Sequence, residues 1–318
     1  MGQVPPPLRT NSSHRDAVLV VTGALTTGAS STLMHLSGTS GPTVAFFRCI
    51  YALPVLAILA AREIRRWGAP GWRAIAVGAV SGVFLALDLI LWFSSIRAIG
   101  AGLSTVVQDM QILFVAGGAW LIFGSKPSRR LALLLPVLLG GIVLISGVIG
   151  SSPRQVALTR GTLLGVASAL AYAAFLLALG WQPEQRQKHN STFLTSVTIA
   201  GATVSLLIGV SGAGIDLRPT WPATGWLILL ALSTQVFGWL VIATAMFRVT
   251  SLQASIALLL QPVSAVLLGW AVLAERPSTL QLLGVAVVVV STALAVETDR
   301  RPPGAPEPAG TVVREQVS

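Results

Sequence analysis

Two stretches of this chain, residues 92–128 and 243–278, repeat one pattern. Each holds an arginine followed after seven residues by a serine, and a tryptophan followed after seven residues by a Pro-Ser pair. These residues are Arg97, Ser104, Trp120 and Pro127 with Ser128 in the first stretch, and Arg248, Ser255, Trp270 and Pro277 with Ser278 in the second. The copies are offset by about half the chain and lie in strongly apolar sequence, which predicts two related halves in a membrane.

Composition indicates that lipid is the solvent for most of the chain. Of the 318 residues, 53% are hydrophobic and only 10% are charged, and the mean hydropathy is +0.78. An ordinary soluble domain carries about 25% charged residues. The net charge of +10 sits between apolar runs and forms no basic stripe, so nucleic acid is not an expected partner. The single cysteine, Cys49, excludes an internal disulfide and a thiolate metal cluster, and we expect neither a metal nor a cofactor.

A spanning helix needs about 20 mainly apolar residues. Ten runs meet that length: 17–36, 43–61, 74–96, 101–124, 131–150, 161–181, 192–212, 224–247, 252–274 and 279–296. The first is long enough to remain as a helix, so we do not expect a cleaved signal. We therefore predict an all-α integral membrane protein with five helices in 17–150 and five in 151–296, where the polar segment 151–160 is the boundary. Residues 1–16 and 297–318 are predicted to be cytoplasmic tails, and the second of these to be disordered.

The distribution of Lys and Arg predicts how the helices are oriented. With the N-terminus inside, fifteen basic residues fall on cytoplasmic segments and five on outer ones. The outer five are Arg97, Arg154, Arg160, Arg218 and Arg276. This asymmetry predicts a multi-pass protein of the cell membrane with both termini in the cytoplasm. Because each half has an odd number of helices, the halves run in opposite directions. Such inverted repeats are typical of transporters whose binding site lies near the midplane.

The second copy contains a recognisable signature. It runs from Phe247-Arg248 through Gln261-Pro262 to Glu275-Arg276-Pro277-Ser278, and Gly284 follows on the next helix. The first copy matches it at Arg97, Ser104 and Lys126-Pro127-Ser128, and Arg48 early in the second helix also fits. With these residues, the chain resembles the drug/metabolite transporter superfamily, in particular the ten-helix group with two EamA-type repeats, over roughly 17–296. The resemblance implies this fold and transport. Gln261 and Ser125 stand where the family pattern has an acidic residue, so it implies no proton or cation role for those positions.

Charged residues within the apolar runs are the strongest candidates for function. An aspartate at the centre of a membrane helix costs about 2.5–3.5 kcal/mol on insertion scales. Asp88 and Asp109 both lie roughly 13 Å below the outer boundary, counted at 1.5 Å per residue, and Arg48 lies roughly 9 Å down. We expect Arg48 to reach one of the aspartates. The group either lines the substrate or coupling path or forms a structural buried pair.

Other candidates accompany this group. Gln108 and Gln111 flank Asp109, Trp92 lies beside Asp88, and Thr26 belongs to a hydroxyl-rich stripe on the first helix. Such stripes either face a central cavity or let helices pack closely. In the second half, Pro262 is expected to break the hydrogen-bond ladder of its helix at mid-membrane, beside Gln261, and to free carbonyl groups there. Trp92 is expected either to stack on a substrate in the cavity or to face lipid.

These features favour a secondary transporter, an exporter of a small metabolite, amino acid-like solute or amphipathic drug. The chain has no GxxxxGK[ST] loop for ATP, so coupling to protons or facilitated exchange is expected. Burial favours a neutral carboxyl group, whereas a nearby arginine favours a charged one. We therefore expect one aspartate to pair with Arg48 and the other, predicted to be Asp88, to carry the proton. A flippase for lipids or lipid-linked intermediates on the same fold is the alternative.

An enzyme is the least favoured class. The segment Gly209-Val210-Ser211-Gly212 superficially resembles an intramembrane serine protease motif, but such a serine needs a nearby histidine base. His14, His35 and His189 are the only histidines, and they fall in a tail, at a helix end and in a loop. We therefore expect no catalytic residue. The expected partners are a small-molecule substrate, the lipid bilayer and protons, and the chain is expected to act as a monomer or homodimer.

Overall fold

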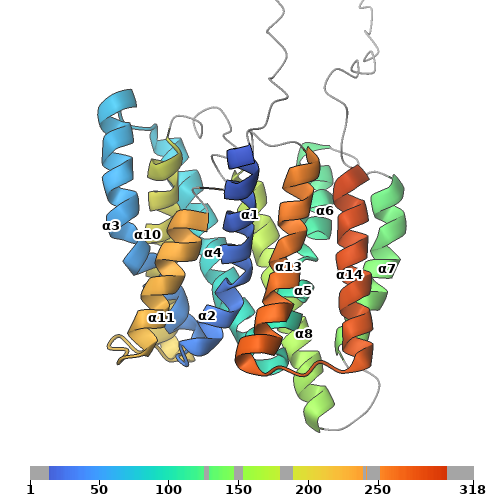
Figure 1. The fold of residues 1–318 in the computed structure, drawn as a ribbon. Coiled ribbons are helices and arrows are strands. Elements are labelled where there is room, and N and C mark those ends of the chain that lie inside the picture. The colour runs from blue at the N-terminus through green and yellow to red at the C-terminus, as the bar shows by residue number, and fades with distance from the viewer. Residues whose placement is uncertain are drawn as a thin grey trace, which may run out of the picture.

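The computed structural model describes residues 14–124, 129–146, 153–179, 189–238, 241 and 251–298. Within these residues the chain forms helices and no strand, and the helices stand side by side as a bundle of ten spans (Figure 1). Most of both predicted tails and the predicted end of the 224–247 run lie outside the described residues. By length and composition, five described helices are able to cross a membrane, and four shorter apolar helices accompany them.

Each half contributes five spans. The first half comprises α1 (His14–Gly28) with α2 (Ser30–Leu36), α3 (Gly41–Trp67), α4 (Trp72–Ile99), α5 (Ala101–Gln108) with α6 (Gln111–Phe123), and α7 (Arg129–Ser146). The second half comprises α8 (Pro153–Leu179), α10 (Asn190–Ile208) with the π-helix η1 (Gly209–Ala213), α11 (Ala223–Leu230) with the π-helix η2 (Ala231–Gly238), α13 (Ser251–Leu273) and α14 (Thr279–Thr298).

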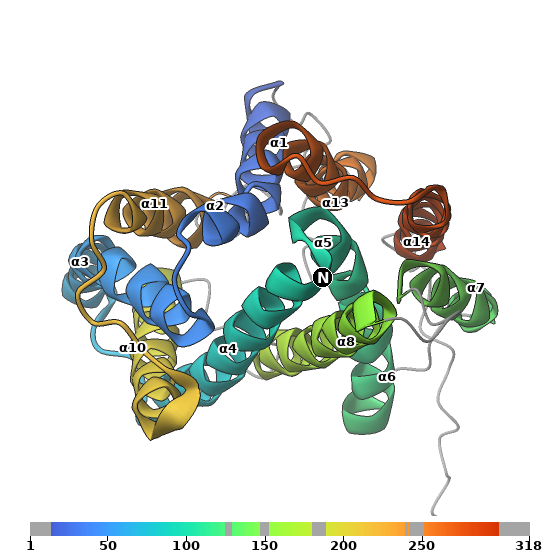
Figure 2. The ribbon, with the colours of Figure 1, turned by 90° about the horizontal axis from the view of Figure 1, so that it is seen from below.

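The packing of the helices follows an inverted repeat. The second spans of the two halves pack together as α3 on α10, and the fifth spans as α7 on α14. The third span of the first half packs on the first span of the second, α4 on α8. The inverted counterpart of this pair is the first span of the first half on the third span of the second. Here α1 contacts η2, and α2 contacts α11. Figure 2 shows α4 beside α8 and α7 beside α14, and in Figure 1 α1 begins and α14 ends at the same end of the bundle.

Helix α8 begins at Pro153, inside the segment 151–160 that the sequence predicts as the boundary between the halves, so residues 153–160 form its first two turns. Proline is favourable at the first helical position because its missing N–H has no partner there in any case. Arg160 and its neighbours are therefore held on a rigid helix that packs on α4.

The fourth spans of the two halves differ where they cross the middle of the bundle. Between α5 and α6, the N–H groups of Asp109 and Met110 bond to carbonyls three residues back, at 3.2 and 3.1 Å, in place of the usual four. The matching helix α13 runs unbroken from Ser251 to Leu273. The helix continues through Pro262, whose missing N–H removes one bond of the ladder without ending the helix. The tight turn falls instead at Asp109, where the first half carries one residue more between its serine and tryptophan.

Candidate functional site

A cavity of about 50 Å³ lies among the helices in the middle of the bundle. Its lining comes from both halves, which is where the inverted repeat places a binding site. The lining residues are Thr27, Ser30, Arg48, Leu85, Asp88, Leu89, Trp92, Thr105, Gln108, Asp109, Gln111, Tyr172 and Gln261. The structure thus brings together every predicted site residue except Thr26 and Pro262.

Asp88 is held by hydrogen bonds from two other helices. The Ser168 hydroxyl of α8 donates to Asp88 Oδ1 at 2.6 Å, and the Gln108 amide of α5 donates to the same oxygen at 2.8 Å. The Gln108 amide also lies 3.2 Å from Ser168 Oγ. Asp88 is only 2% exposed, so these bonds replace the water that a carboxylate would otherwise bind. The network ties α4, α5 and α8 together at the cavity.

Arg48 has a different partner from the one expected. Its Nε donates to Gln235 Oε1 at 3.0 Å, and within the described part of the chain no ion pair joins it to either aspartate. Gln235 lies in η2, and the wider turn of a π-helix re-aims side chains, which is why such turns are frequent at functional sites. Arg48 Nη1 is buried and has no hydrogen-bond partner among the described residues. The predicted arginine–aspartate pair is thus replaced by a bond between the halves that leaves a buried guanidinium donor free.

Arg48 Nη1 is one of several polar atoms at the site that are buried and have no hydrogen-bond partner among the described residues. Among the described residues the donors are Arg48 Nη1, Trp92 Nε1 and Gln235 Nε2, and the acceptors are Asp109 Oδ2 and Gln111 Oε1. The donors come from α3, α4 and η2, whereas both acceptors come from the junction of α5 and α6. Buried polar groups are nearly always hydrogen-bonded, so this set makes the cavity the candidate place for a ligand.

The hydroxyl groups of the first span bond within their own helix, and only some of these residues line the cavity. Thr26 donates its hydroxyl to Gly23 O of its own helix at 2.9 Å and does not line the cavity. Thr27 and Ser30 line it from the same span, although their hydroxyls also bond within the helix at 2.8 and 2.6 Å. Trp92 is 6% exposed and lines the cavity, so it faces the site and not lipid.

Three residues of the site were not predicted from the sequence. Ser168 and Tyr172 lie one helical turn apart on α8, and Gln235 lies in the apolar eighth span. A serine or tyrosine in a membrane helix is too common to single out. A glutamine within an apolar run is rarer, and a search of the second half for amides as well as charges would have found Gln235.

Glu275, the acidic residue of the family signature, lies away from the cavity. Its carboxylate accepts hydrogen bonds from the backbone N–H groups of Ala101, at 2.5 Å, and Gly102, at 3.2 Å. These are orphan donors at the start of α5, so Glu275 caps a helix of the other half. Gly100 precedes this helix with φ of +92°, and a Cβ there would lie 2.8 Å from the Glu275 carboxyl carbon. No group of three His, Cys, Asp or Glu residues suited to a metal occurs among the described residues.

Ten helices in two inverted sets around a buried polar cavity define a multi-pass membrane protein of the transporter type. A profile of the EamA-like transporter family matches the chain twice, over residues 15–147 and 159–296, and the chain belongs to that family. It is therefore a membrane transporter of the drug/metabolite transporter type, and the family's members are transporters, not enzymes.

Further comparisons concern only the fold. No curated protein matches the chain. A solved structure described only as the crystal structure of a protein shares 17% identity with a TM-score of 0.58. The alignment covers 91% of this chain and 100% of the other. At that identity the likeness supports the architecture and carries no information about substrate.

Proposed function

We propose that the protein is a secondary exporter of a small zwitterionic, amino acid-like solute, working by alternating access. The observation that carries this proposal is the division of the unpartnered atoms into donors and acceptors. Arg48, Trp92 and Gln235 offer N–H groups that suit a carboxylate, whereas Asp109 and Gln111 offer oxygens that suit an ammonium group. A solute with both groups satisfies both sets at once.

The size of the cavity supports a moving mechanism. A ligand site usually measures about 300–1,000 Å³, whereas this cavity measures about 50 Å³ and holds only a few water molecules. A solute therefore needs the helices to separate before it binds. In an inverted repeat, the halves rock against each other around a fixed central site. Bonds that join the halves across the cavity, such as Arg48 to Gln235 and Ser168 to Asp88, are the ones that this motion strains.

Proton coupling is proposed at Asp109. The sequence favoured Asp88, because it stands alone in an apolar helix. In the structure Asp88 Oδ1 already has two donors, whereas Asp109 Oδ2 has none among the described residues. A buried carboxylate oxygen without a donor is stabilised by a proton or by a substrate ammonium group, and competition between the two links substrate release to proton uptake. A proton moving inward would then drive the solute outward.

Ligand-dependent thermal unfolding of the purified protein tests the substrate class. A ligand that binds only the folded state raises the unfolding temperature. The panel would contain the common amino acids and, for each that binds, its carboxamide and its decarboxylated amine. We expect the zwitterion to stabilise the protein most, Arg48→Gln to remove the preference over the amide, and Asp109→Asn to weaken binding.

Asp216→Asn is the matched control, because Asp216 lies in the loop between η1 and α11 and does not line the cavity. It should bind the solute as the wild type does. If the amide and the amine stabilise the wild type as well as the amino acid does, the zwitterion assignment is wrong.

A further inference from the structure

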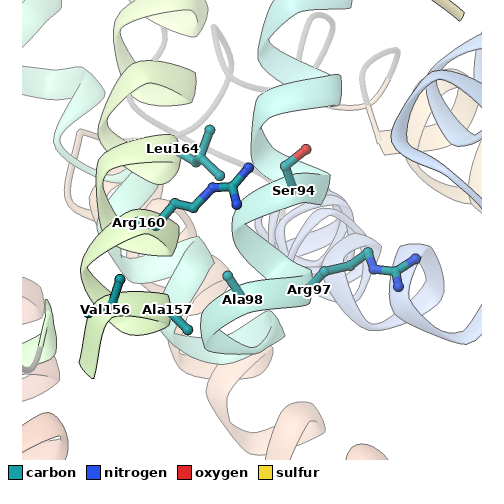
Figure 3. Close-up of a pocket in the computed structure, with 7 residues that line it drawn as sticks. All are labelled: Ser94, Arg97, Ala98, Val156, Ala157, Arg160 and Leu164. Carbon is teal, nitrogen blue, oxygen red and sulfur yellow. The ribbon is translucent and has the colours of Figure 1, made fainter. Parts of the chain in front are cut away.

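A second cavity lies outside the transport path. It measures about 540 Å³ and is formed where the last turns of α4 meet the first turns of α8. Its lining is Ser94, Arg97, Ala98, Val156, Ala157, Arg160 and Leu164, and it shares no residue with the central cavity (Figure 3). Figure 3 shows Arg160 reaching from α8 towards Ser94 of α4, while Arg97 projects from the end of α4 and away from Arg160. Two cations thus border one cavity in an otherwise mainly apolar lining.

These arginines have no counter-ion within the described residues. At this end of the bundle the described carboxylates are those of Asp216 and Glu275. Asp216 Oδ1 accepts the backbone N–H of Arg218 at 2.9 Å, and Glu275 caps α5. No ion pair joins Arg97 or Arg160 to a described carboxylate. Two like charges on neighbouring helices repel each other, so an anion in the cavity, towards which the flexible Arg97 side chain can turn, would be stabilised by both.

Apolar side chains continue from this cavity along the membrane-facing sides of both helices. On α4, Val83 and Leu87 lie on the same face as Arg97 and Ser94, at spacings of fourteen and seven residues. They are 38% and 36% exposed. On α8, Leu163 and Leu170 follow Arg160 on the outward side and are 64% and 55% exposed. An apolar track with a cationic end matches a lipid, with its phosphate at the arginines and a chain along the helices.

We propose that Arg97 and Arg160 bind the phosphate of an anionic phospholipid in the cavity between α4 and α8. Guanidinium groups bind phosphate oxygens through paired hydrogen bonds, and arginine is over-represented at such sites. A lipid with an ammonium head group is disfavoured, because its positive charge would face two arginines with no carboxylate beside them. A soluble phosphate would leave the apolar track uncovered. The site also gives a role to Arg97, a residue of the repeated pattern that the central cavity does not use.

Native mass spectrometry of the full-length protein in detergent tests the site with phosphatidylglycerol and phosphatidylcholine of equal chain length. We expect phosphatidylglycerol to bind more tightly. The double variant Arg97→Gln/Arg160→Gln should weaken that binding about tenfold or more, since each arginine near a membrane surface contributes on the order of 1 kcal/mol. Arg97→Lys/Arg160→Lys keeps the charge and should retain most of it.

Arg218→Gln/Arg276→Gln is the control, because both arginines lie at the same end of the bundle and neither lines the cavity. An equal loss in this control would show diffuse attraction and would overturn the site. Equal binding of phosphatidylcholine, or displacement of the lipid by millimolar inorganic phosphate alone, would also overturn it. The inference does not depend on the proposed substrate, since the readout is lipid binding and not transport.

Discussion

Glu275 shows how a residue of a family signature acts through the backbone. Its carboxylate binds the first N–H groups of α5, so it fastens the fourth span of one half to the end of the fourth span of the other. Glu63 has a similar part at the other end of the bundle, where it accepts the N–H groups of Ser191 and Thr192 at the start of α10, both at 2.8 Å. At both positions a carboxylate stabilises the positive end of a helix dipole.

Replacing Glu275 with glutamine should therefore destabilise the protein without changing substrate preference. A glutamine has a single oxygen to accept hydrogen bonds, so one N–H group of Ala101 or Gly102 loses its partner. We expect a loss of about 0.5–2 kcal/mol, the range for lost helix caps. Thermal unfolding in detergent measures it, with Arg276→Gln as the exposed neighbouring control. An unfolding temperature equal to that of the wild type would show that the cap contributes nothing.

Single charged residues in apolar runs were predictable at this scale, but their partners were not. Asp88, Asp109 and Arg48 are conspicuous because a charge in a membrane helix is costly. The bond of Arg48 to Gln235 depends on the packing of η2 against α3, which joins residues 187 positions apart. No spacing in the sequence encodes that distance, so the sequence favoured the nearest opposite charge.

The helices pack closely where glycines remove side chains. A Cβ at Gly82 of α4 would collide with the carbonyl oxygen of Val197 in α10, and one at Gly284 of α14 would lie 2.7 Å from Gly141 O in α7. Small residues at such crossings are how membrane helices approach one another, because lipid offers no hydrophobic driving force between them. The contacts of α4 with α10 fix Asp88 at its depth.

The variant Gly82→Ala tests this contact. The added methyl group must push α4 away from α10, and overpacking of this kind costs about 1–3 kcal/mol. Gly117→Ala in α6 is the matched control, because nothing lies within 4 Å of a Cβ placed there. Thermal unfolding should separate the two variants. Equal unfolding temperatures would mean that the α4–α10 contact is looser than the structure has it.

Helix number was predictable because it depends on the length of the apolar runs, but helix interruptions were not. Pro262 removes one backbone hydrogen bond from its helix, yet the helix continues through it. A single lost bond is tolerated in a membrane helix when neighbouring groups pack around it. The extra residue of the first half is absorbed instead by the tight turn at Asp109. The difference in length between the two repeats therefore indicates the position of the tight turn at Asp109, whereas the proline does not.

At the scale of the molecule, the charge asymmetry predicts which end faces the cytoplasm. Trp67 ends α3 and Trp72 begins α4, and the two are 50% and 74% exposed. Arg66 and Arg73 are stacked over their rings at 4.9 and 5.7 Å. Exposed tryptophans are typical of either membrane interface, and the arginines beside them favour the cytoplasmic one. The end with Arg97 and Arg160 is then predicted to be extracellular.

Cysteine labelling checks this orientation. In a background with Cys49→Ser, Pro70→Cys between α3 and α4 should resist a membrane-impermeant maleimide added to whole cells. Leu217→Cys, in the exposed loop between η1 and α11, should react with it. The opposite pattern would reverse the topology and place the lipid site in the inner leaflet.

Transport across a sealed membrane tests the central claim, that the buried polar cavity is a proton-coupled path for a zwitterion. Proteoliposomes with a pH-sensitive dye inside would receive the amino acid that stabilises the protein most. The wild type and Asp216→Asn should show proton flux on addition of the solute, while Asp109→Asn and Arg48→Gln should show none. Undiminished flux in Asp109→Asn and Arg48→Gln would contradict the account.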